Sequence, residues 1–81
     1  MNRYEYMFIA ECPTDGDEIT YRLTVETASM IKAEDVREAC AQCTLGFHEA
    51  FAEELHQRLG GRQTLVALHR GVLITTERGC V

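Results

Sequence analysis

An apolar stripe with helical spacing runs through the middle of the chain and constrains the fold more than any other feature. Its members recur at intervals of three and four residues: Val36, Cys40, Cys43, Phe47, Phe51 and Leu55. Positions with this spacing share one face of an amphipathic α-helix. Arg58 near the end of the stripe suits the helix dipole, and Gly60 with Gly61 ends the helix. The pattern predicts one long helix from residue 33 to about residue 59, with Gly46 as the position where it would bend.

The segment before this helix has the pattern of a β-hairpin. Residues 4–10 are rich in aromatic and apolar side chains, and residues 18–28 alternate between apolar and polar side chains. Alternation of this kind is typical of a strand with one buried face. Pro13 and Gly16 lie between the two runs and favour a turn. We therefore expect two antiparallel strands here.

Two further apolar, β-branched runs follow the helix, at residues 64–68 and 72–76. Arg70 and Gly71 between them favour a tight hairpin turn. The order of elements is then ββαββ, and a chain of 81 residues leaves no room for a second domain. We predict a single α+β domain over residues 1–81, in which one long amphipathic helix packs on one face of a four-stranded antiparallel sheet.

The charge of the chain is negative and unevenly distributed. The net charge is −5, and residues 1–40 hold nine acidic and four basic side chains, whereas the remainder holds four of each. Because phosphates repel an acidic chain, we expect no direct binding of nucleic acid. No apolar run approaches the ~18 residues of a membrane helix, and the N-terminus lacks the pattern of a leader peptide. We expect a cytoplasmic protein, and the preference for Arg over Lys suggests a bacterial or phage gene.

The four cysteines are expected to be thiols, as in other cytoplasmic proteins. Cys40 and Cys43 form a C-x-x-C motif, but they lie on the core stripe and no second pair of ligands accompanies them. We therefore interpret both as buried core residues rather than as a redox or zinc site. Cys12 and Cys80 are interpreted as incidental free thiols, and an intermolecular disulfide through either of them is left open.

The sequence contains no recognisable catalytic motif. His48, His56 and His69 have no Ser or Cys nucleophile at a familiar spacing, and we place them on the solvated surface. Residues 15–18 form an acidic turn that lacks the ligand spacing of a calcium loop. We interpret this turn as solvated, with recognition of arginines on a partner as the alternative. No enzymatic activity, cofactor or metal is expected.

The face of the predicted helix opposite the core is the most informative surface. Seven residues fall within one broad arc of the helical wheel: Glu34, Asp35, Glu38, Gln42, Leu45, Glu49 and Glu53. Carboxylates in such an arc can pair with basic side chains of a partner, while the leucine fills a pocket on it. The alternative is a solvated charged face. We predict that these residues bind a basic protein, for which nucleic-acid-handling complexes are the obvious candidates.

In size, acidity and order of elements, the chain resembles the small phage-encoded inhibitors known as anti-CRISPR proteins. The likeness rests on the acidic helix 34–56 and on the hairpins 4–28 and 64–76. No family motif matches, so no functional residue is carried across. The resemblance implies a non-catalytic protein that binds and inhibits a CRISPR effector complex in the cytoplasm of a bacterial host.

Three other functions stay open at this stage, and the least favoured is direct binding of nucleic acid through the C-terminal arginines Arg62, Arg70 and Arg78. The first is a homodimeric structural or regulatory bacterial domain, because a small four-stranded sheet leaves edge strands that can pair with a second copy. A monomeric mass at micromolar concentration in reducing buffer would contradict it. The second is a thiol-redox protein or small enzyme that depends on Cys40 and Cys43.

Overall fold

The computed structural model describes residues 1–80, and its first two elements form the expected hairpin. Strand β1 (Asn2–Glu11) pairs antiparallel with strand β2 (Glu18–Thr27). The apolar side chains of β2 alternate with polar ones and are all buried: Ile19, Tyr21, Leu23 and Val25. Alternation along β2 therefore predicted its buried face correctly. Strand β1 extends beyond the predicted residues 4–10 at both ends, and β2 ends one residue before the predicted residue 28.

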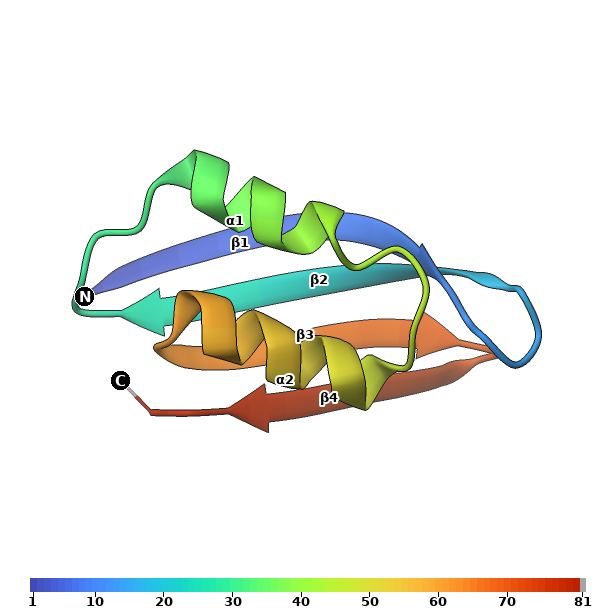
Figure 1. Cartoon of the computed structure of the whole chain (residues 1–81). Coiled ribbons are helices and arrows are strands. Elements are labelled where there is room, and N and C mark those ends of the chain that lie inside the picture. The colour runs from blue at the N-terminus through green and yellow to red at the C-terminus, as the bar shows by residue number, and fades with distance from the viewer. Residues whose placement is uncertain (81) are drawn as a thin grey trace.

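The second hairpin also forms where its turn residues predicted it. Strand β3 (Arg62–His69) pairs antiparallel with strand β4 (Val72–Arg78). Arg70 and Gly71 join them with φ values of 52° and 80°, the pair of positive values that a type I′ turn requires. Strand β3 also pairs antiparallel with β2, so the sheet order is β1-β2-β3-β4 (Figure 1).

The prediction of one long helix was wrong, because the structure contains two helices and the order of elements is ββααββ. Helix α1 (Ala33–Ala41) and helix α2 (His48–Leu59) are separated by an extended link. The backbone N–H of Glu11 donates to the Thr44 carbonyl over 2.9 Å, and the N–H of Gly46 donates to the Glu11 carbonyl over 3.3 Å. These bonds hold the link against the end of β1 and replace helical hydrogen bonds.

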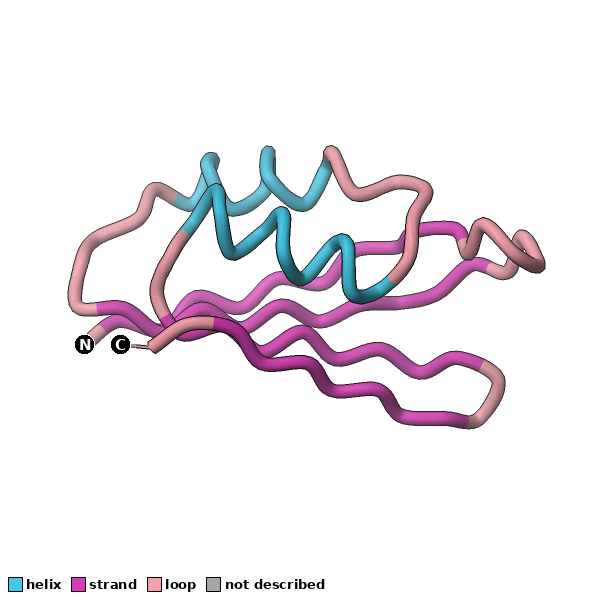
Figure 2. The backbone as a smooth tube through the Cα atoms, turned by 60° about the horizontal axis from the view of Figure 1, so that its bottom comes forward, coloured by secondary structure: helices cyan, strands magenta, loops and turns pink. Residues whose placement is uncertain are grey.

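Breaking the helix lets it cover the sheet more completely. A single helix of about 27 residues would be about 40 Å long and only one helix wide. Instead, α1 packs on β1, and α2 packs on β3 and β4, so that the two helices lie side by side and antiparallel (Figure 1). Both lie on the same face of the sheet (Figure 2). The fold is therefore a two-layer α+β domain with helices on one face.

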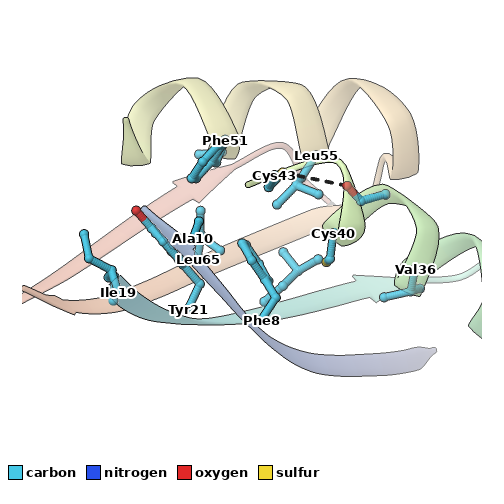
Figure 3. Close-up of a cluster of buried hydrophobic side chains, with 14 of the residues drawn as sticks. Phe8, Ala10, Ile19, Tyr21, Val36, Cys40, Cys43, Phe51, Leu55 and Leu65 are labelled. Atoms are coloured by element: carbon cyan, nitrogen blue, oxygen red, sulfur yellow. Dashed lines mark hydrogen bonds between the residues drawn. The ribbon is translucent and has the colours of Figure 1, made fainter. Parts of the chain in front are cut away.

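The core lies between this helical layer and the sheet (Figure 3). Phe8 and Tyr21 stack with their ring centroids 5.1 Å apart, and Phe51 of α2 meets Tyr21 edge-on at 5.4 Å. Such offset and edge-to-face pairs stabilise beyond the area that they bury. Leu23 of the sheet and Leu55 of α2 are fully buried. Phe47 was expected in this core but is 58% exposed, because it precedes α2 instead of lying within a helix.

The opposite face of the sheet has no helix packed on it within residues 1–80, and several of its apolar side chains are exposed: Met7, Ile9, Leu68 and Leu73. Strands β1 and β4 are the two edges of the sheet. An edge strand presents unpaired backbone groups to which another chain can add. Formation of a homodimer remains a prediction. This face and these edge strands are the surfaces through which two copies would pair. Within the same residues, no helix is long and apolar enough to span a membrane.

Candidate functional site

A cavity of about 340 Å³ opens at the end of the sheet where the two hairpin turns lie together. The β1–β2 turn, the start of α2 and the end of β3 surround it. Its walls are largely apolar and come from Ile19, Tyr21, Phe47, Ala67 and Ile74. Ligand pockets in proteins measure roughly 300–1,000 Å³ and combine apolar walls with a few polar groups. The cavity therefore has the size and lining of a small-molecule site.

The carboxylate of Asp15 is the polar centre at the rim of this cavity. One of its oxygens accepts the Asp17 backbone N–H over 2.9 Å, and the other lies 3.1 Å from His69 Nε2 and 3.0 Å from Arg70 Nε. The Asp17 backbone hydrogen bond is the main reason that the pKa of Asp15 falls from 3.8 to about 2, and the Cys12 thiol and Arg70 lower it further. Asp15 is therefore ionised at neutral pH.

Cys12 approaches the same carboxylate from the end of β1. Donor atoms of Cys12, Asp15 and His69 all lie within 4.8 Å of one another. The Cys12 N–H donates to the Asp17 carbonyl and the Cys12 carbonyl accepts from Gly16, both over 2.9 Å, so the turn holds the thiol in place. Cys12 is a free thiol, as interpreted, but it is buried rather than exposed in the loop, with only 8% of its surface accessible.

His48 begins α2 and lines the other side of the cavity. Both of its ring nitrogens are buried, and neither has a hydrogen-bond partner among residues 1–80. Burial lowers the pKa of His48, since desolvation penalises the charged ring, and the nearby Leu65 backbone opposes this shift without completing a hydrogen bond. The ring is therefore neutral, with one buried donor and one buried acceptor unpaired. His48 was predicted on the solvated surface, and that prediction was wrong.

The other predicted thiols behave as core or surface groups. Cys40 and Cys43 are each 1% exposed, as predicted, and the Cys43 thiol donates to the Ala39 carbonyl (Figure 3). Burial raises the pKa of Cys40 to about 12 and that of Cys43 to about 11. Both thiols are therefore protonated at neutral pH, which disfavours the thiol-redox alternative. Cys80 is exposed.

The break between the helices divides the predicted partner-binding arc into three parts. Glu34, Asp35 and Glu38 are exposed on α1, whereas Gln42 and Leu45 lie in the link. The remaining two, Glu49 and Glu53, lie on α2 and both pair with Arg78 of β4. The seven residues therefore do not form one continuous helical face. Whether they bind a partner remains a prediction.

Comparisons with known proteins show a fold but no family. No family model and no curated protein matches the chain. Among solved structures, the chain is similar to an archaeosine synthase described as QueF-like and solved in its apo form. The TM-score is 0.71 at 16% sequence identity, and the match covers 99% of this chain and 94% of that chain. At this identity the two chains share a fold, and no residue role is carried across.

The residues at the cavity could not be grouped from the sequence. Cys12 and Asp15 are neighbours in one turn, but His69 is 54 residues away from Asp15. The prediction of two antiparallel hairpins was the only sequence signal for this grouping. When β2 lies next to β3 in an antiparallel sheet, both hairpin turns lie at the same end of the sheet. The sequence leaves the order of the strands undetermined, so it does not by itself place the two turns together.

Proposed function

We propose that this protein binds a small, flat organic molecule in the cavity between the hairpin turns and the start of α2. The observation that carries this proposal is the convergence of Cys12, Asp15 and His69 at the rim of an apolar cavity of about 340 Å³. Apolar walls favour burial of a ring, while a few placed polar groups orient it.

The state of His48 supports the same conclusion. A buried donor or acceptor without a partner costs about 1–3 kcal/mol, and both ring nitrogens of His48 are in this state. His48 is one of the residues that line the cavity. A ligand that supplies a hydrogen bond to the ring recovers part of this cost.

Benzimidazole, which carries one ring donor and one ring acceptor, serves as the probe. With EDTA present to remove metals, millimolar benzimidazole is expected to shift the NMR methyl signals of Ile19, Ala67 and Ile74. An Ile74→Trp variant is expected to abolish the shifts of Ile19 and Ala67, because the indole fills the cavity. Leu73→Trp is the matched control, since Leu73 is 67% exposed and its side chain points to the opposite face of the sheet. Unchanged methyl signals, or equal loss in both variants, would contradict the proposal.

We also propose a second function, binding and inhibition of a basic, nucleic-acid-handling protein such as a CRISPR effector. The observation that favours it is the free acidic face of α1, where Glu34, Asp35 and Glu38 are exposed and have no ion pair among residues 1–80. Leu45, in the link that follows, is 62% exposed. Exposed carboxylates beside an apolar side chain suit a basic partner surface.

The second proposal is tested by charge reversal on α1. Purified CRISPR effector complexes are expected to retain the protein at low salt and to bind the Glu34→Lys, Glu38→Lys variant at least tenfold more weakly. The control carries Glu5→Lys and Glu18→Lys, which change the net charge equally on the first hairpin. Glu49 and Glu53 are left intact because their reversal would break the pairs with Arg78. Equal retention of both variants would refute a role for α1.

A further inference from the structure

We propose that Cys12, Asp15 and His69 bind one divalent transition-metal ion of the zinc class, with a fourth coordination position open to the cavity. The proposal deepens the ligand-binding function, because the ion would lie at the rim of the same cavity. Its ligands are the Cys12 sulfur, one Asp15 carboxylate oxygen and an imidazole nitrogen of His69.

The spacing of the three donor atoms suits such an ion. Zinc binds sulfur at about 2.3 Å and nitrogen or oxygen at about 2.0–2.2 Å, so tetrahedral ligands lie about 3.5 Å from one another. The three donors here already lie within 4.8 Å of one another, and His69 Nε2 is 3.1 Å from the Asp15 carboxylate. Small side-chain movements complete the coordination, while the backbone of the turn stays in place.

The donor set selects the class of metal. A thiolate with an imidazole and a carboxylate is typical of zinc and related ions, whereas magnesium and calcium prefer oxygen ligands alone. Three protein ligands leave the fourth position for water or a bound molecule, as in zinc sites that act on substrates. All three ligands line the cavity, so a molecule in the cavity can reach this position.

The local charges also balance. Binding releases the Cys12 thiol proton to solvent, and the resulting thiolate together with ionised Asp15 offsets the two positive charges of the ion. Arg70 Nε lies 3.2 Å from the Asp17 carboxylate, so these two charges offset each other beside the site. Arg70 can therefore release Asp15 to the metal and keep an ionic partner.

The arrangement differs from a nucleophilic triad. In a triad the imidazole lies between the nucleophile and the carboxylate. Here a single imidazole nitrogen, His69 Nε2, lies 3.1 Å from Asp15 and 3.7 Å from Asp17, and the donor atoms of Cys12, Asp15 and His69 all lie within 4.8 Å of one another. Three donor atoms that converge on one region are better suited to coordinating a metal ion than to transferring a proton as in a triad.

Cobalt(II) titration of the metal-free protein tests the site directly. All proteins carry Cys80→Ser, so that the exposed Cys80 thiol contributes no cobalt–thiolate absorption. We expect one equivalent of Co²⁺ to give the intense near-ultraviolet absorption of a cobalt–thiolate bond, and Zn²⁺ to displace it. Cys12→Ser should remove this absorption, while His69→Gln should weaken Zn²⁺ binding at least tenfold. His56→Gln is the control, because His56 lies on α2, away from the cavity.

Thermal unfolding separates a lost site from a lost fold. Zn²⁺ is expected to raise the Tm of the Cys80→Ser protein and of the His56→Gln variant, but not of Cys12→Ser or His69→Gln. The absence of cobalt–thiolate absorption, or its persistence in Cys12→Ser, would overturn the metal site. Benzimidazole binding in EDTA is measured independently, so its failure would overturn the ligand-binding proposal without affecting this one.

Discussion

Replacing Leu55 with Ala is expected to lower the free energy of unfolding by about 2–5 kcal/mol. Leu55 has no exposed surface and lies on α2 within the core between helix and sheet (Figure 3). The shorter side chain leaves a cavity that the surrounding structure fills only in part. Gln63 limits that relaxation, because its buried side-chain amide donates to the Leu55 and Gly60 carbonyls and ties the end of α2 to β3.

Urea unfolding followed by circular dichroism measures this effect. Leu45→Ala is the matched control, because Leu45 is 62% exposed in the link between the helices, and surface changes usually stay within about 0.5 kcal/mol. We expect the loss of unfolding free energy to be several-fold larger for Leu55→Ala than for Leu45→Ala. Similar losses for both variants would contradict the burial of Leu55 between α2 and the sheet.

Replacing Gly61 with Ala is expected to cost about 2–5 kcal/mol for two separate reasons. Gly61 has a φ of 70°, and this left-handed backbone costs roughly 1–2 kcal/mol for a residue with a Cβ atom. That Cβ would also lie 2.7 Å from the Glu26 carbonyl oxygen of β2, and overpacking of this kind costs typically about 1–3 kcal/mol.

Gly71→Ala separates these two contributions. Gly71 has a φ of 80°, but a Cβ there would meet nothing within 4 Å. We therefore expect Gly71→Ala to show the backbone cost alone and to be the milder variant in the same urea experiment. A Gly61→Ala protein as stable as Gly71→Ala would show that β3 does not begin as closely against β2 as the structure places it.

The proposed site shows why its parts were harder to predict than the strands. The turn at residues 12–17 was predicted from Pro13 and Gly16, but the same residues were interpreted as solvated. Cys12 is buried within the core, and Asp15 of the same turn contacts His69, which is 54 residues away in the sequence. His48 was placed on a polar helical face because a single continuous helix was assumed, whereas it begins a separate helix that packs over Tyr21.

The amino-acid sequence by itself determined the class of the fold, both hairpins, the Arg70–Gly71 turn and the buried state of Cys40 and Cys43. These features depend on local periodicity and turn chemistry, which neighbouring residues specify. Only the tertiary structure decided the break between α1 and α2, because Glu11 of β1 supplies the hydrogen bonds that hold the link. It also decided the grouping of Cys12, Asp15 and His69, since strand order sets which turns meet and no local pattern encodes that order.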